Sequence, residues 1–228
     1  MENFIEQFQL NFIEGDRFLL LLEGLRNTLI IAFFALILGL VLGFLVAIVR
    51  STHDKRGGFK VLNAICTVYI TVIRGTPTLI QLMIMYYIIL VAVTNSIVVA
   101  ILAFGINSGA YIAEIVRGGI MSVDEGQYEA GRSLGLSYRK TMRKIIMPQA
   151  VKNSLPALGN EFITLLKETS ISGYIGIFEL TRAGDIIRSR TYSAFMPLIA
   201  VALIYLVIVI VLTKLLRIME KRLQNSDR

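Results

Sequence analysis

The sequence is poor in the residues that most often carry catalysis or metal binding. It has a single cysteine, Cys66, and a single histidine, His53. One cysteine excludes a disulfide within the chain, and because Cys66 lies in an apolar stretch we expect it to be a small buried hydrophobic residue. His53 lies in a polar loop, and we find neither a metal-ligand cluster nor a catalytic triad. The phosphate-binding pattern G-x-x-x-x-G-K-[ST] is also absent, so we expect no ATP hydrolysis by this chain.

Charge is scarce as well, because Asp, Glu, Lys and Arg make up 17% of the chain where a soluble protein has about 25%. Hydrophobic residues make up 55%, and many lie in runs without any charge. The three main runs are residues 29–49, 75–113 and 194–213. About 20 apolar residues cross the hydrocarbon core of a membrane. The first and last runs therefore fit one crossing each, and the middle run of 39 residues can hold a turn between two.

These runs predict an all-α integral membrane protein in which residues 1–228 form one transmembrane domain. The second crossing should be kinked or broken at Arg74-Gly-Thr-Pro77, because proline removes a backbone donor and strains the preceding turn. The fourth crossing contains Lys152, Glu161 and Lys167, and hydropathy alone misses it. We expect five transmembrane helices, at about residues 25–49, 61–91, 97–121, 150–167 and 194–216, with the loop 122–149 outside the membrane.

The Lys and Arg residues predict the orientation. Residues 50–60, 121–152 and 214–228 hold 15 of the 23, and loops rich in these residues stay in the cytoplasm. Even numbers of crossings must then separate the three segments, and this parity requires the fourth crossing. We expect a multi-pass protein of the cell's inner or plasma membrane, with the N-terminus outside and the C-terminus cytoplasmic. The net charge of +7 then reflects orientation, with some contact to anionic membrane lipid and no nucleic acid.

The N-terminal charge is wrong for a secretory leader. The first 26 residues hold five acids against Arg17 and Arg26, whereas a signal peptide begins with a basic region. We therefore expect no cleaved leader and take the first crossing as the insertion signal.

The polar and basic loop 122–149 carries the most specific pattern. Residues 125–134 predict a short helix, with Gly135 at its C-terminal cap. Ser137 is placed to cap a second helix over residues 138–146, and we expect Pro148 to stop it. Two short helices would thus meet in an L. The structural alternatives are a helix lying on the lipid headgroups and a soluble helix-turn-helix.

This loop resembles the EAA loop of permeases from ATP-binding-cassette (ABC) importers. The matching residues are Glu129-Ala-Gly-Arg-Ser-Leu-Gly135 and, nine residues on, Ile145-Ile-Met-Pro148. Gly131 stands where the family usually has Ala, and Met147 where it usually has Leu. Gly131 is expected to loosen the first helix slightly.

Four further strings resemble the branch of this family that imports polar amino acids such as histidine, arginine, glutamine and cystine. They are Arg74-Gly-Thr-Pro77, Ala110-Tyr-Ile-Ala-Glu-Ile-Val-Arg-Gly-Gly119, Leu155-Pro-Ala-Leu-Gly-Asn-Glu-Phe162 and Lys167-Glu-Thr-Ser170. The strings stand in the family's order, and the resemblance covers roughly residues 25–217. The resemblance implies a type I ABC importer fold and uptake of a polar amino acid by alternating access.

The resemblance also implies partners. The loop would be the coupling helix that docks on a separate cytoplasmic ATPase, through Glu129, Ala130, Gly135, Leu136, Ser137 and Arg139. Two such ATPase subunits would bind ATP and Mg²⁺, and this chain would hold no cofactor. A second permease subunit, identical or a paralogue, is expected because five crossings are too few to enclose a path. An extracellular solute-binding protein would meet residues 169–193 and the turn near Asn95.

Polar residues within the crossings are candidates for the substrate path, because polar groups at membrane depth are costly. In the fourth crossing they recur at steps of three and four, and so share one helix face. This polar stripe consists of Asn153, Ala157, Asn160, Glu161, Thr164 and Glu168. We expect the stripe to line the path, with Glu161 near mid-depth. Glu161 meets either the ammonium or basic side chain of the substrate, or a structural partner such as Arg74, Arg117 or a symmetry mate.

Four more residues are candidates with structural alternatives. Arg74 and Thr76 lie at the break in the second crossing, where free backbone groups can bind zwitterions. Alternatively, Arg74 simply lies at a helix junction. Ser108 and its neighbour Asn107 lie in the middle of the third crossing, where they contact substrate or bond across helices.

Two features of the crossings are expected to be structural. Glu114 and Arg117 are three residues apart, which favours an ion pair on one helix. The pairs Gly39/Gly43 and Gly105/Gly109 have the spacing that lets two membrane helices approach closely.

Two other classes of protein compete with the importer subunit. An ion-coupled secondary amino-acid carrier would need internal repeats and a relay of intramembrane acids, and no convincing repeat is present. A membrane-anchored regulator would use residues 125–146 to bind a partner or DNA, and would not need the polar stripe. Whether the substrate is a basic or a neutral amino acid stays open.

Overall fold

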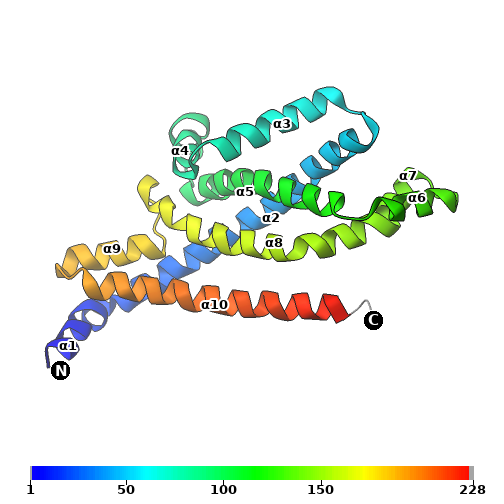
Figure 1. Ribbon diagram of the computed structural model, residues 1–228. Helices are drawn as coiled ribbons and strands as arrows, with labels where there is room; N and C mark the ends of the chain where they lie inside the picture. Colours follow the sequence, from blue (N-terminus) through cyan, green and yellow to red (C-terminus); the bar gives the residue numbers. More distant parts are fainter. Residues whose placement is uncertain (1, 226–228) are drawn as a thin grey trace.

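A computed structural model describes residues 2–225, and these residues form helices joined by short connections (Figure 1). Before the first long helix come α1 (Glu2–Phe8), the π-helical η1 (Gln9–Ile13) and the 3-10 turn η2 (Glu14–Asp16). The long helices are α2 (Phe18–Arg56), α3 (Lys60–Gly75), α5 (Ser96–Met121), α8 (Met147–Glu168) and α10 (Phe195–Asn225). The shorter elements are α4 (Thr78–Ile84), η3 (Met85–Ile89), α6 (Glu125–Ser133), α7 (Tyr138–Thr141), η4 (Met142–Ile146), η5 (Thr169–Ile175) and α9 (Leu180–Thr191).

The protein is an all-helical membrane protein with three or four apolar spans in the described part of the chain. Three helices are long and apolar enough to cross: Phe18–Lys55, Ser96–Met121 and Phe195–Arg222. The bent pair Lys60–Gly75 and Thr78–Ile89 makes a fourth if it counts as one span. Helix α8, the expected fourth crossing, is not in this set, because its charged residues lower its hydropathy.

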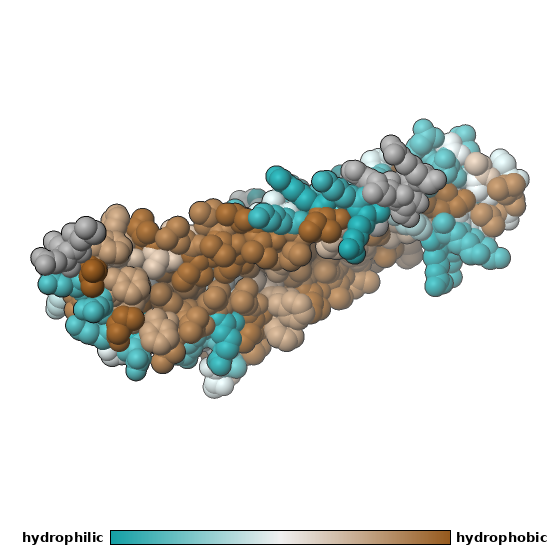
Figure 2. Space-filling view, turned by 90° about the horizontal axis from the view of Figure 1, so that it is seen from below, coloured by the Kyte–Doolittle hydropathy of each residue, from teal (hydrophilic) through white to brown (hydrophobic). Residues whose placement is uncertain are grey.

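The surface carries the apolar residues that a membrane requires. Only 28% of the most apolar window of α2 and 11% of that of α10 are buried within the chain. Figure 2 shows one face covered mainly by hydrophobic residues, with hydrophilic residues gathered toward its ends. So large an exposed apolar surface is rare on a soluble monomer, and lipid or neighbouring helices cover it in the membrane.

The three basic segments lie at one end of the molecule. The connection between α2 and α3, the helices α6 and α7, and the C-terminal end of α10 are all found there (Figure 1). Helix α9 and the N-terminal helix α1 lie at the opposite end. The spatial arrangement therefore matches the common side that the Lys and Arg counts require.

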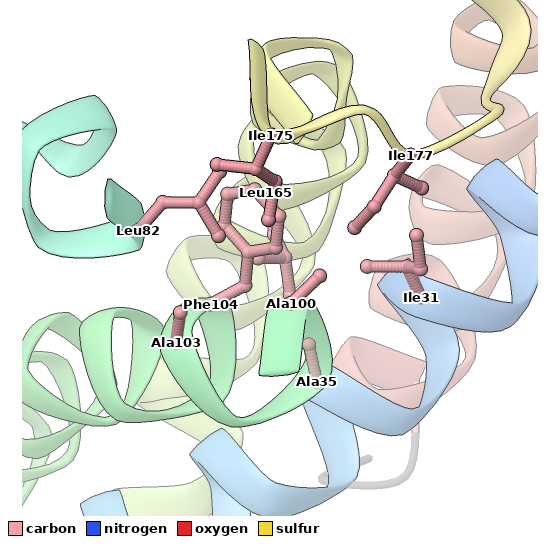
Figure 3. Close-up of a cluster of buried hydrophobic side chains, with 9 residues drawn as sticks. All are labelled: Ile31, Ala35, Leu82, Ala100, Ala103, Phe104, Leu165, Ile175 and Ile177. Carbon is pink, nitrogen blue, oxygen red and sulfur yellow. The ribbon is translucent and has the colours of Figure 1, made fainter. Parts of the chain in front are cut away.

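Helices α2 and α5 pack closely because glycines on each helix lie against side chains of the other. A Cβ on Gly43 would lie 2.5 Å from Ile112 Cγ2, and one on Gly105 would lie 2.6 Å from Leu38 Cδ2. Both distances are too short for real atoms, so the close approach expected from the glycine spacing is confirmed. A buried cluster next to this contact brings together Leu82 of α4, Phe104 of α5 and residues of α2, α8 and the segment 169–193 (Figure 3).

The expected second crossing, residues 61–91, is broken at the predicted place into two helices. The axes of α3 and the α4–η3 helix differ by 111°, and Thr76 between them is extended. Pro77 has no N–H, so the carbonyl of Ile73 loses its helical partner. Gln81 replaces that donor, because its Nε2 lies 2.7 Å from the Ile73 oxygen. A side chain thus satisfies the backbone group that the break leaves free.

The loop between α5 and α8 matches its predicted form at the start and departs from it at the end. Helix α6 is present, and Gly135 has the left-handed φ of 78° expected after a helix. The prediction that Pro148 stops the second helix is wrong. It lies in the first turn of α8, where a backbone donor is not needed, and the chain stays helical from Tyr138 to Glu168 through η4. The wider π turns of η4 directly precede the proline.

We predict that Gly105→Ala destabilises the protein and that Gly118→Ala on the same helix does not. The added Cβ at residue 105 overlaps Leu38, a kind of overpacking that costs about 1–3 kcal/mol. At residue 118 it meets nothing within 4 Å and gains up to about 1 kcal/mol of helix propensity. Thermal unfolding of both variants in one detergent measures the difference. Equal melting temperatures would contradict the close packing of α2 on α5.

Candidate functional site

Two neighbouring residues of α5 connect it to two other helices. Ser108 Oγ donates a hydrogen bond of 2.8 Å to Oε1 of Glu161 on α8. Asn107 Nδ2 donates one of 2.9 Å to Oε1 of Gln81 on α4. Ser108 and Asn107 are buried. Of the two roles expected for them, the structure places them in bonds across helices.

The polar stripe of α8 is left open by the rest of the chain. Asn153, Asn160 and Thr164 are exposed, and Glu161 is partly buried. The opposite side of the same helix is covered, with Ile163 and Leu166 against the core. Where such a face lies at membrane depth, it needs water, a substrate or another subunit on that side.

Arg74 lies at the junction of three helices. Its guanidinium is 3.8 Å from the carboxylate of Glu114 and 5.2 Å from the centre of the Tyr111 ring. Thr76 donates to the carbonyl of Val72 and accepts from Gln81. These contacts agree with the junction alternative for Arg74. Its side chain is still 43% exposed, so it borders the open side of the protein.

An ion-pair network ties the C-terminal halves of α2 and α5 together. Glu114 accepts from Arg117 at 3.2 Å and from Arg50 of α2 at 3.0 Å. Arg117 also lies 3.4 Å from Asp54. The expected Glu114–Arg117 pair is confirmed, and Arg74 and Arg117 both reach Glu114 rather than forming the pair with Glu161 that we considered. The carboxylate of Glu161 is left with a neutral hydroxyl donor from Ser108.

Gln81 is the functional-site residue that the sequence reasoning missed. It bonds to Ile73, Thr76 and Asn107, and so joins both sides of the broken span to α5. The available signal was an amide in a charge-free run, one helical turn after a proline. Such an amide is well placed to bond the carbonyls that the proline leaves free.

The loop at the basic end is braced internally. Asp124 caps α6 and Ser137 caps α7, and Arg132 donates to the carbonyl of Leu136 at 2.7 Å. Lys55 of α2 lies over the ring of Tyr128 at 5.5 Å. The loop is therefore fixed both to itself and to the end of the first span.

The predicted coupling residues occupy the outward side of this loop. Leu136 is half-buried, and the others are partly or fully exposed: Glu129, Ala130, Gly135, Ser137 and Arg139. The exposed set forms a surface at the end of the molecule, with Leu134 beside it at 79% exposure.

Gly131 has a steric role. A Cβ there would lie 2.7 Å from Thr141 Cγ2 and 3.0 Å from Ile145 Cδ1. The two arms of the L meet at this point, and the glycine lets them touch. The expectation that Gly131 only loosens α6 is therefore incomplete, because it also permits close packing of α6 on the second arm.

The segment 169–193, between α8 and α10, is attached to the first span. Asn27 Nδ2 donates to the carbonyl of Phe178 at 2.8 Å, and Thr28 Oγ1 accepts from the Leu180 N–H at 3.2 Å. Glu179 is fully buried and caps α9 by accepting from the N–H groups of Thr181 and Arg182. Burial raises the pKa of the Glu179 carboxyl, while these N–H groups counteract the rise. Among residues 2–225 no group of three His, Cys, Asp or Glu is placed to hold a metal ion.

Apolar spans, an open polar stripe on α8 and a braced loop outside the spans are features expected of the membrane subunit of a transporter. The chain belongs to the family of binding-protein-dependent transport system inner membrane components, whose family model matches residues 39–225. It is therefore a multi-pass permease component of an ABC importer in the inner membrane, a system that includes an ATPase and a binding protein. Such subunits are not enzymes and carry no cofactor. The ion-coupled carrier and the anchored regulator are thereby set aside, and the resemblance seen in the loop is confirmed.

Its relatives cover nearly the whole chain. The glutamine transport system permease protein GlnP of Escherichia coli (strain K12) is 41% identical over 209 residues, which is 90% of this chain and 93% of that protein. The putative glutamine transport system permease protein GlnP of Rickettsia typhi is 36% identical over 210 residues, 91% of this chain and 94% of that protein.

Solved structures share the fold. One is the crystal structure of an amino acid ABC transporter with histidines, with 43% identity, a TM-score of 0.82 and coverage of 89% of this chain and 94% of that one. An inward-facing structure of the MetNI methionine ABC transporter has a TM-score of 0.79 at 22% identity, covering 90% and 97% of the two chains. The second likeness concerns the fold alone.

We predict that Gly131→Ala weakens the loop and that adding Thr141→Ser restores it. The alanine methyl overlaps the Thr141 methyl, whereas serine lacks that methyl and keeps the hydroxyl that bonds the Ser137 carbonyl. The overlap costs about 1–3 kcal/mol. Melting temperatures of the two single variants and the double variant measure the coupling between the sites. Purely additive effects would refute a contact between the two arms at Gly131.

Proposed function

We propose that this chain is the permease subunit of an importer for polar amino acids, with Glu161 at the substrate path. The open polar stripe carries the proposal, because it presents a carboxylate and neutral polar groups on a side that the chain itself leaves uncovered. Its closest partner, Ser108, is neutral, so the negative charge of Glu161 is available to an ammonium or a basic side chain. Asn160 and Thr164 flank it on the same face and suit a polar or zwitterionic ligand.

The substrate class follows from the relatives. Glutamine is in the names of the relatives from Escherichia coli and Rickettsia typhi, and the 43% identical structure contains histidines. These ligands share an α-ammonium and an α-carboxylate, and each has a polar side chain. Glu161 suits the ammonium, and the partly exposed Arg74, with Thr76 next to it at the helix break, suits the carboxylate.

The arrangement in the membrane is proposed to be five crossings within a single domain, residues 1–228. Helix α8 has 22 residues, about 33 Å at the α-helical rise, and a hydrocarbon core is about 30 Å thick. It packs alongside α5 and α10 and runs antiparallel to both (Figure 1). With α8 as a crossing, the N-terminus lies outside and the three basic segments lie in the cytoplasm.

The subunit arrangement follows from the two open surfaces. A second permease subunit, a copy or a paralogue, would cover the polar stripe and complete the path. The exposed coupling surface, with Glu129, Ala130, Gly135, Leu136, Ser137 and Arg139, would dock on one of two ATPase subunits, which bind ATP and Mg²⁺. The outer segment 169–193 and the turn at Asn95 would meet the solute-binding protein. There the Tyr192 side chain is 97% exposed and is a ready contact for a protein partner.

Labelling of cysteines introduced at two matched arginine positions tests the five-crossing arrangement. In a Cys66→Ala background, which removes the single cysteine, we expect Arg190→Cys to react with an impermeant maleimide in intact spheroplasts. Arg139→Cys should react only after the membrane is opened. Both positions are exposed helix residues of the same type. Labelling of both from one side would show that α8 does not cross.

Substitution of Glu161 tests the substrate contact. In the complete transporter we expect Glu161→Gln to lower the uptake of glutamine, histidine and arginine by about tenfold or more, because hydrogen bonds to charged groups contribute about 1.5–3 kcal/mol. The loss should appear mainly in KM, with the melting temperature unchanged. Ser108→Ala is the matched control, since it removes the hydrogen bond to Glu161 and keeps the charge.

The two variants separate a substrate contact from a structural role. If Ser108→Ala lowers uptake and stability as much as Glu161→Gln does, the carboxylate acts through its bond to α5. Wild-type uptake of all three amino acids by Glu161→Gln would refute the proposed site.

A further inference from the structure

A groove of about 500 Å³ opens between the end of the first span and the second arm of the loop. Its apolar wall includes Ile48 of α2, Ile120 of α5 and Met147 at the start of α8, with Met142 and Phe59 beside them. Ile48 and Phe59 are strongly exposed. The groove is thus an apolar surface at the ends of two membrane spans, outside the polar stripe and its hydrogen bonds.

Two arginines border this apolar wall. Arg139 and Arg143 are four residues apart on the helical run that starts at Tyr138, and so lie on one face. Both are exposed, and within residues 2–225 neither has a carboxylate partner. A site that binds only hydrocarbon would not need two cations beside its apolar wall, so the arginines indicate a ligand that also carries negative charge.

A buried hydroxyl adds a polar donor to the same groove. Ser51 lines the groove and is 1% exposed, and its Oγ has no hydrogen-bond partner among the described residues. A buried polar group without a partner is costly. A ligand oxygen in the groove would satisfy it.

We propose that this groove binds one anionic phospholipid of the leaflet on the loop side. An acyl chain lies against Ile48, Met142 and Met147, and the phosphate lies against Arg143, the bordering arginine that is not part of the coupling surface. Ser51 donates to an oxygen of the glycerol or ester region. The groove is at headgroup depth, because it spans the last turns of α2 and α5, which are apolar spans. Basic pockets between membrane helices recognise anionic headgroups in this way.

The lipid would join the first span to the coupling loop. Ile48 and Ser51 belong to α2, whereas Arg139 and Arg143 belong to the arm that leads into α8. A single molecule that contacts both would stabilise their relative position. The anionic content of the membrane would then affect the stability of the loop.

Native mass spectrometry of the complete transporter tests the proposal. With phosphatidylglycerol or phosphatidylcholine added at equal concentration, we expect the phosphatidylglycerol to be retained, one molecule per permease chain. Arg143→Gln should reduce its retention about fivefold, since each cation near an anionic lipid surface contributes about that factor. Lys144→Gln is the matched control, because it removes one positive charge from the adjacent residue, which does not line the groove.

A second variant tests the apolar part of the groove. Thr52→Phe fills space beside Ile48 without changing any charge, and we expect it to abolish retention of phosphatidylglycerol. Melting temperatures near that of the wild type establish that the variants are folded. A retained lipid in Thr52→Phe would overturn the placement of the acyl chain.

Three other results would overturn the proposal. Equal losses in Arg143→Gln and Lys144→Gln would mean diffuse attraction to the basic surface. Competition by inorganic phosphate at concentrations similar to that of the lipid would mean a free-phosphate site. Retention by the permease alone but not by the complete transporter would mean that the groove is an ATPase contact.

Discussion

The contact between α2 and α5 is the constraint on which the rest of the structure depends. Glycines on both helices bring the backbones together, and this approach sets the position of Ser108, whose Cβ is 3.2 Å from where a Cβ on Gly39 would be. The same approach lets Arg50 reach Glu114 one span away. Helix α5 then receives α8 through Glu161 and α4 through Gln81. The polar contacts of the site are therefore arranged around one tight helix pair.

One continuous helical run connects the loop to the polar stripe. The chain stays helical from Tyr138 through η4 and α8 to Glu168. A displacement at the loop end can therefore pass along one helical run to the residues beside Glu161 without crossing a flexible joint. The π turns of η4 are the one irregular section, and they are where such a run bends most readily. This geometry suits a subunit in which force is applied at one end and a path changes at the other.

Periodicity and charge predicted the features that depend on neighbours in sequence. The span at α5, the Glu114–Arg117 pair, the glycine contacts and the cap at Gly135 all follow from spacing within one helix or turn. Contacts between elements that are distant in the sequence could not be predicted in this way. Nothing local indicates that Arg74 reaches Glu114, or that Gln81 completes the backbone bonds at Ile73. Pro148 was misread because proline ends a helix or opens one, and only the continuing chain decides which.

The open polar stripe has a consequence for how cells produce this protein. With α8 as the proposed fourth crossing, a copy without a neighbour over it would expose Asn160, Glu161 and Thr164 to lipid, where polar groups are poorly tolerated. A subunit without its neighbour would therefore present an exposed polar stripe that membrane proteases can recognise. Synthesis in step with the rest of the complex avoids that loss, and gives a physical reason for biogenesis of the subunits together.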